Sequence, residues 1–151
     1  MFSEMERRGN ECYRSAMSDP MHAGGCLCGA VRFRAAGPAR HLCYCHCVTC
    51  RRAAGAPAVP WATFDLARFE LTHGTLTQYR SSAHVLRGFC NTCGTSLTFR
   101  NEQRPTEIDV TLACLDEAER FVPTMHVWVA DKLPWTVLAD DLPQHPAGVG
   151  S

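Results

Sequence analysis

Residues 43–50 read Cys-Tyr-Cys-His-Cys-Val-Thr-Cys and concentrate four thiols and one imidazole within eight positions. Two more thiol pairs flank this segment, one at Cys26 and Cys28 and the other at Cys90 and Cys93. Thiolate and imidazole groups are the ligands that zinc prefers in proteins. The pattern predicts a small zinc protein with two sites, in which the outer pairs hold the fold and the central segment carries the chemistry.

The composition is that of one soluble globular domain, with 46% hydrophobic and 20% charged residues in a chain of 151. No apolar run reaches the ~18–20 residues that span a bilayer. Residues 1–19 are polar and lack the apolar core of a signal peptide. We therefore expect a cytoplasmic protein with no membrane partner. Clustered thiols in that reducing compartment predict metal ligands rather than disulfides.

The formal net charge of the chain is zero with histidine neutral. Zinc loading would make the balance acidic, because each divalent ion is outnumbered by the thiolates that bind it. Non-specific nucleic-acid binders normally show a basic surplus. The charge balance therefore argues against nucleic acid as a partner.

Three parts are expected along the chain: a flexible leader over residues 1–20, a single domain over 21–142 and a frayed tail over 143–151. Short stretches with period-2 alternation or apolar character predict strands over 30–35, 40–47, 58–64, 69–72, 75–80, 85–89, 95–100 and 108–112. Many short strands and no long amphipathic helix predict a mainly β fold class.

The connections between these strands are also predicted. His73 and Gly74 are expected to join two strands in a hairpin, and residues 22–30 to form a glycine-rich turn. Residues 47–54 suit a short helical turn that ends at a glycine. In an extended segment, alternation places Cys43, Cys45 and Cys47 on one face, with Tyr44 and His46 on the other.

The first candidate metal site joins the two outer pairs, with ligands Cys26, Cys28, Cys90 and Cys93. Two close pairs that are far apart in the chain can close a tetrahedral site and staple the fold together. Because a closed site has no vacancy for a substrate, the expected role of this zinc is structural.

The second candidate site is the run Cys45, Cys47 and Cys50. Three thiolates leave one tetrahedral position for water or substrate, which is the arrangement of catalytic zinc. The spacing alone leaves open a second closed structural site completed by Cys43 or His46, of which the facing argument favours Cys43, and, less favoured, an iron–sulfur cluster.

These residues together resemble the glutathione-dependent formaldehyde-activating enzyme family, which includes centromere protein V. The matching segments fall in the family's order, with seven cysteines in register, over residues 25–31, 45–51, 79–82 and 87–95, followed by Pro123, His126, Trp128 and Trp135. Cys43 has no counterpart in the family pattern.

The resemblance implies a zinc-pinned, tent-like β domain of short antiparallel strands, with one structural zinc at the outer pairs and one catalytic zinc at Cys45, Cys47 and Cys50. It also implies a carbon–sulfur lyase that condenses formaldehyde or a related aldehyde with glutathione to give S-hydroxymethylglutathione. Its partners would then be a small-molecule thiol and aldehyde. As a hypothesis, Arg51, Arg52 or Arg87 would bind a glutathione carboxylate through paired hydrogen bonds.

A competing hypothesis is a non-catalytic, zinc-stabilised protein-interaction module. The second zinc separates the two, since a free fourth position supports an enzyme and four protein thiolates support a module.

Overall fold

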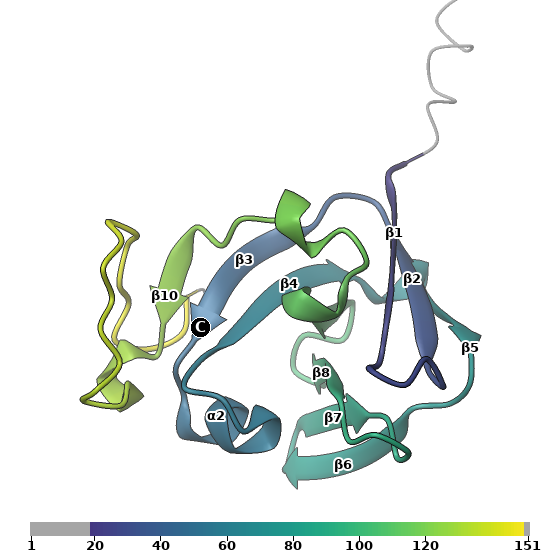
Figure 1. The fold of residues 1–151 in the computed structure, drawn as a ribbon, viewed down its shortest axis with the longest axis horizontal. Coiled ribbons are helices and arrows are strands. Elements are labelled where there is room, and N and C mark those ends of the chain that lie inside the picture. The colour runs from purple at the N-terminus through teal and green to yellow at the C-terminus, as the bar shows by residue number, and fades with distance from the viewer. Residues whose placement is uncertain (1–18, 150–151) are drawn as a thin grey trace, which may run out of the picture.

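A computed structural model of the protein describes residues 19–149 (Figure 1). Most of the expected leader, including the thiol of Cys12, and residues 150–151 of the expected tail lie outside the described residues. The strands are β1 (Met21–Gly25), β2 (Arg32–Ala36), β3 (Arg40–Cys45), β4 (Val59–Asp65), β5 (Phe69–His73), β6 (Thr77–Ser82), β7 (Val85–Phe89), β8 (Ser96–Asn101), β9 (Glu107–Thr111) and β10 (Met125–Val127).

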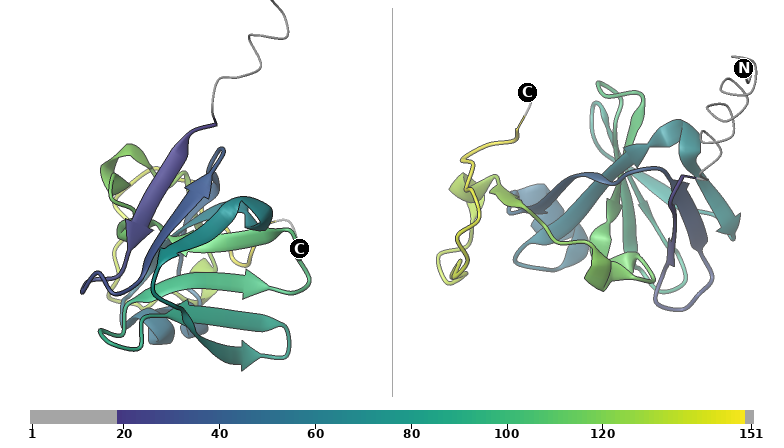
Figure 2. Two further views of the ribbon diagram at one scale, coloured as in Figure 1. Left: turned by 90° about the vertical axis from the view of Figure 1, so that its right-hand side faces the viewer. Right: turned by 90° about the horizontal axis from the view of Figure 1, so that it is seen from above.

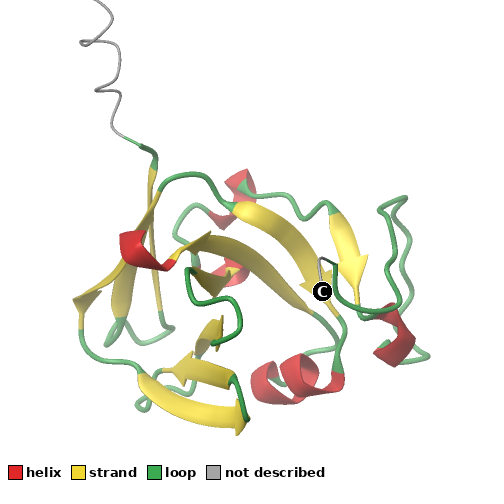
Figure 3. Ribbon diagram, turned by 180° about the vertical axis from the view of Figure 1, so that it is seen from behind, coloured by secondary structure: helices red, strands yellow, loops and turns green. Residues whose placement is uncertain are grey.

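Among the described residues, helical structure is confined to α2 (Val48–Ala54) and to short 3₁₀ turns η2 (Leu66–Arg68), η3 (Leu112–Cys114), η4 (Ala118–Arg120) and η5 (Val129–Asp131). Figure 3 shows that strands dominate the fold and that α2 follows directly on the end of β3. The predicted mainly β fold class is therefore confirmed. Within residues 19–149, no helix combines the length and apolarity needed to cross a membrane.

The strands form two sheets, a small one in the order β1-β2-β5 and a larger one in the order β10-β3-β4-β9-β8-β7-β6. All pairings are antiparallel except that of β10 with β3. Figure 2 shows the small sheet and the C-terminal segment at opposite ends of the molecule. The larger sheet therefore lies between these two ends.

The main hydrophobic core lies where the two sheets meet. Its largest fully buried side chains include Phe33 of β2, Phe64 of β4 and Leu97 of β8. Pro60 fits in β4 because it pairs only with Tyr44 of β3, while the ladder with β9 begins one residue later, at Trp61. A second, smaller core cluster contains Cys45, Cys50, Val59, Trp61 and Val127.

The predicted hairpin at His73 and Gly74 is wrong. Strand β5 pairs with β2 in the small sheet, whereas β6 pairs with β7 in the larger one. Phe69 of β5 stacks on Phe33 with ring centres 5.4 Å apart, which gives β5 an apolar partner in the small sheet. Gly74, at φ +70°, is where the chain leaves the small sheet.

Two further segments differ from expectation. Residues 21–25 form strand β1 rather than a turn, with Gly24 opposite Phe33. A β-carbon at Gly24 would lie 2.5 Å from the Phe33 ring, so glycine is needed here for close packing.

Residues 143–149, which we expected to be frayed, instead run along β10, where the His126 N–H donates to the Pro143 carbonyl at 2.8 Å. Trp135, which matches the family pattern, is exposed.

Candidate metal centres

The two outer thiol pairs meet in space. The sulfurs of Cys26, Cys28, Cys90 and Cys93 all lie within 4.8 Å of one another, in the loops that follow β1 and β7. The Val31 N–H donates to the Cys26 sulfur at 3.2 Å, a bond that favours thiolate. Hydrogen bonds from the Thr95 hydroxyl and backbone lower the pKa of Cys93 to about 5. Four clustered sulfurs, two of which accept such hydrogen bonds, fit a tetrahedral zinc.

The central thiols form a second group, in which the sulfurs of Cys45, Cys47 and Cys50 also lie within 4.8 Å of one another. Cys45 ends β3, Cys47 is the N-cap of α2, and Cys50 lies in the helix's first turn. The Cys47 sulfur accepts the Cys50 N–H at 3.3 Å, so the helix cap itself gathers two of the three thiols. Gly55, in the left-handed conformation, ends the helix.

Charge in this group is shared unequally. Hydrogen bonds from the Cys45 and Cys50 thiols lower the pKa of Cys47 far below its usual value. The hydrogen bond to Cys47, followed by that to Cys50 and burial, raises the pKa of Cys45. A divalent cation bound by the three sulfurs would displace the thiol protons and offset the negative charge of the resulting thiolates. The soft donors and their convergence fit zinc.

Neither Cys43 nor His46 joins this group among the described residues. Cys43, Cys45 and Cys47 line one cavity, as the alternation predicted. Burial raises the pKa of the Cys43 thiol to about 12, so it is neutral in the metal-free chain.

His46 belongs to a buried chain of hydrogen bonds on the opposite face of β3. Its Nε2 lies 2.9 Å from Nδ1 of His126, and Nε2 of His126 lies 3.1 Å from both carboxylate oxygens of Asp140. The carboxylate can only accept, so His126 Nε2 donates to it and His126 Nδ1 accepts from His46. Tyr44 stacks on His126 with ring centres 5.1 Å apart. The sequence analysis named His126 as a residue of the family pattern but did not predict its contact with His46.

The three-thiol group opens into a cavity of about 770 Å³. Trp61, Val85, Phe99 and Val127 provide apolar walls, and the three thiols belong to the same lining. Two lining residues, His41 at φ +48° and Trp128 at φ +59°, hold left-handed backbone conformations that non-glycine residues rarely adopt. Such conformations cluster at functional sites because the surrounding fold must impose them.

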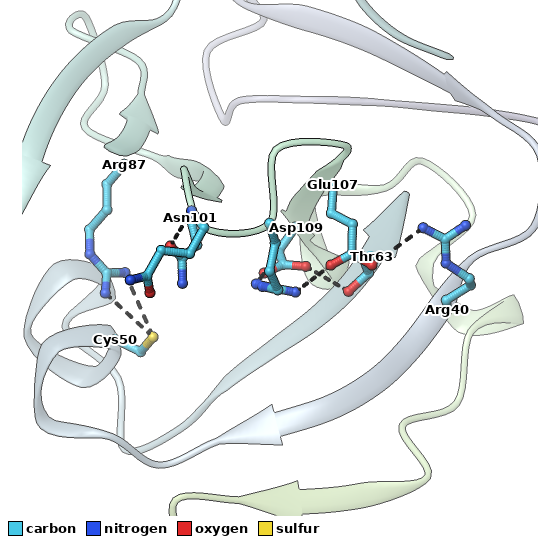
Figure 4. A network of polar contacts seen from close by, with 9 residues as sticks. Arg40, Cys50, Thr63, Arg87, Asn101, Glu107 and Asp109 are labelled. Carbon is cyan, nitrogen blue, oxygen red and sulfur yellow. Dashed lines mark hydrogen bonds and ion pairs between the residues drawn. The ribbon is translucent and has the colours of Figure 1, made fainter. Parts of the chain in front are cut away.

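A polar network that sequence reasoning missed forms another part of the cavity wall (Figure 4). The Thr63 hydroxyl donates to Asp109 Oδ1 at 2.6 Å, and Arg104 donates to Asp109 Oδ2 at 2.8 Å and to Glu107 at 2.7 Å. Arg40 lies 3.7 Å from Glu107. The available signal was a charged residue, Asp109, between the buried apolar residues of β9.

The three arginines predicted to bind a substrate carboxylate lie in different surroundings. Arg87 lines the cavity, and its guanidinium lies beside the Cys50 sulfur. Arg51 donates to the backbone carbonyls of His46 at 3.1 Å and Asp131 at 3.2 Å and does not line the cavity. Arg52 is exposed and also outside the lining. The structure therefore brings only Arg87 to the thiols.

Comparisons with known proteins agree with this arrangement. The family model described as "Glutathione-dependent formaldehyde-activating enzyme" matches residues 21–131. A Schizosaccharomyces pombe protein named an uncharacterized lyase is 32% identical over 80 residues, which is 53% of this chain and 58% of that protein. A crystal structure of a Rhodobacter sphaeroides protein matches with a TM-score of 0.54 and 28% identity, covering 63% of this chain and 88% of that one.

Proposed function

The chain belongs to the glutathione-dependent formaldehyde-activating enzyme family, and on that premise we propose that it is a zinc-dependent carbon–sulfur lyase that joins a small aldehyde to a thiol. The observation that carries the proposal is the group of three convergent thiols that line the cavity, with no fourth protein ligand among the described residues. Zinc held by Cys45, Cys47 and Cys50 would supply a Lewis acid with one free coordination position.

The chemistry needs no oxidant or reductant. The thiol sulfur forms a bond to the carbonyl carbon, and the thiol proton ends on the carbonyl oxygen. The cavity suits such a reaction because the apolar side chains of Trp61, Phe99 and Val127 line it together with the three thiols. Its volume of about 770 Å³ falls in the range of pockets for drug-sized ligands, far above what formaldehyde needs. This volume leaves room for a larger second reactant beside the aldehyde.

We take glutathione as the thiol and formaldehyde as the aldehyde because the family's description names both, with S-hydroxymethylglutathione as the product. The outer thiols would hold a second, structural zinc, and residues 21–142 would form the catalytic domain. The S. pombe relative is named a lyase, which supports the reaction class. The proposed location is the cytoplasm, where thiol ligands stay reduced.

Replacement of Cys47 by Ser tests the proposal. We expect the variant to lose one of two zinc equivalents and all product formation above the spontaneous reaction of thiol and aldehyde. Cys43→Ser is the matched control for metal content, because Cys43 lines the same cavity but stands outside the thiol group. A folded Cys47→Ser protein with full activity would refute the proposed mechanism.

The alternative of a protein-interaction module has one observation in its favour. Trp135 and Val137 are 68% and 83% exposed and lie two residues apart, so they offer a partner an apolar contact. A module would not need the open thiol group or the cavity, so the enzyme is the better-supported function.

A further inference from the structure

Arg87 is a buried cation without a carboxylate partner. It lies in β7 between β6 and β8, is only 6% exposed, and its guanidinium lies 5.0 Å from the centre of the Phe99 ring. Burying a charge is costly unless an opposite charge lies close by. Within residues 19–149, no aspartate or glutamate approaches Arg87 to ion-pair distance. Its counter-charge must therefore be something other than a carboxylate.

The guanidinium of Arg87 points toward the Cys50 sulfur (Figure 4). Nη1 and Nη2 lie 3.6 and 3.7 Å from the Cys50 sulfur, a two-pronged contact with one atom. Nη2 also donates to the Thr49 hydroxyl at 3.1 Å, and Nε donates to the Ser81 hydroxyl at 3.1 Å. The two hydroxyls fix the guanidinium plane, and it faces the Cys50 sulfur, which becomes a thiolate when it binds a metal.

These contacts decide what else Arg87 can bind. A guanidinium carries five N–H groups, and four are engaged by Cys50, Thr49 and Ser81. The single N–H left over cannot make the paired hydrogen bonds that a carboxylate takes from an arginine. With these contacts in place, Arg87 therefore cannot bind a glutathione carboxylate through paired hydrogen bonds.

We propose that Arg87 is the counter-charge of the three-thiol centre and thereby a positioning residue for the substrate sulfur. Three thiolates with one divalent ion carry a formal charge of minus one, and a fixed arginine brings the centre to neutrality. A neutral centre accepts a further anionic sulfur, whereas a negative one repels it. The first half of the proposal concerns metal binding alone, and the second half rests on the proposed function.

The metal half is tested by zinc competition titrations against a chromophoric chelator. Arg87→Gln removes the charge, and we expect zinc affinity at the three-thiol centre to fall by about 10–100-fold, with a smaller loss in Arg87→Lys. Arg52→Gln is the matched control, since it removes an exposed charge two residues after Cys50, and less than a twofold change is expected. Equal effects of Arg87→Gln and Arg52→Gln would overturn the proposal.

The substrate half is tested by thiol binding to cobalt-substituted protein, followed by sulfur-to-metal charge-transfer absorption. Glutathione and 2-mercaptoethanol are the two probes. If Arg87 offsets negative charge at the substrate sulfur, Arg87→Gln should lower the binding affinity of both thiols by the same factor. Weakening of glutathione alone would overturn the proposal, because it would place Arg87 at the carboxylates that 2-mercaptoethanol lacks.

Two controls keep the test decisive. Retention of zinc at the outer cysteines reports that a variant has folded, since those ligands lie outside the cavity lining. Should Arg87→Gln fail to fold, Ser81→Ala removes one anchor of the guanidinium and keeps its charge, and a smaller loss of zinc affinity at the same centre is expected. No loss in Ser81→Ala would then count against the proposal. If the wild type binds neither thiol, the proposed function fails while the zinc titrations still decide the role of Arg87.

Discussion

The hydrogen bond between Thr63 and Asp109 offers a quantitative test of the cavity's polar wall. Both residues are buried, at 2% and 8% exposed, and the hydroxyl donates to the carboxylate at 2.6 Å. Thr63→Val keeps the shape of the side chain and removes only the donor. Hydrogen bonds to charged groups contribute about 1.5–3 kcal/mol, so the free energy of unfolding should fall by about that amount.

Urea unfolding at pH 7 with buffered free zinc measures this loss. With a slope of about 2 kcal/mol per molar, a loss of ~2 kcal/mol lowers the midpoint by about 1 M at constant slope. Thr111→Val is the matched control on the neighbouring strand, because Thr111 is 8% exposed and donates to the neutral Ser96 carbonyl at 2.9 Å. Its cost should be about 0.5–1.5 kcal/mol.

The difference between the two threonines carries the argument, because it isolates the charge of Asp109. In an Asp109→Asn background, the cost of Thr63→Val should drop to that of Thr111→Val, which a double-mutant cycle measures. If Thr63→Val costs no more than Thr111→Val in the unmodified chain, the reasoning about the buried carboxylate is refuted.

Three further predictions follow from other parts of the fold. Removal of both metals by a chelator should unfold the domain, since a structural zinc contributes on the order of 10 kcal/mol, and near-ultraviolet circular dichroism would show the loss; persistent native dichroism contradicts the zinc-pinned fold. Gly74→Ala should cost about 3 kcal/mol or more, because a β-carbon there lies 1.9 Å from the Ala30 carbonyl oxygen. Gly55→Ala, in open space at φ +63°, should cost only about 1–2 kcal/mol in the same urea assay, and equal costs contradict the contact. The hydrogen bond from the His126 N–H holds the pKa of Asp140 below its usual 3.8. The stability that this hydrogen bond contributes to the folded protein is therefore present above pH 3.8 and lost as the pH falls through the lowered pKa. Carbon NMR should find the pKa of Asp140 back near 3.8 in His126→Phe, and an unmoved pKa contradicts this.

Local spacing predicted the parts of the site that lie close together in the chain. Alternation along residues 40–47 placed Cys45 and Cys47 on one face with Cys43, and the glycine at 55 marked the end of the helix that carries Cys50. The predicted joining of the outer thiol pairs also agrees with their positions, because paired spacing of soft ligands is a strong signal.

Interactions between distant strands escaped prediction. Strand β5 pairs with β2, where Phe69 stacks on Phe33, and not with β6. Strand periodicity predicts which face of a strand is buried but not which strand lies beside it. The contact of His46 with His126 spans 80 positions, and that of Arg87 with Cys50 spans 37. Such pairs follow from topology, so the sequence pattern alone assigned Arg87 to a substrate carboxylate instead of to a thiol.

The central claim is that one of two zinc sites has a free position for a substrate sulfur. Zinc content per chain with zinc X-ray absorption, before and after addition of glutathione, tests it most directly. We expect two zinc ions, one bound by four and the other by three of the seven clustered sulfurs. The three-sulfur zinc should also have one light-atom neighbour, which a sulfur replaces when glutathione is added. Two zinc ions with all-sulfur surroundings that do not respond to glutathione would contradict the account and favour the interaction module.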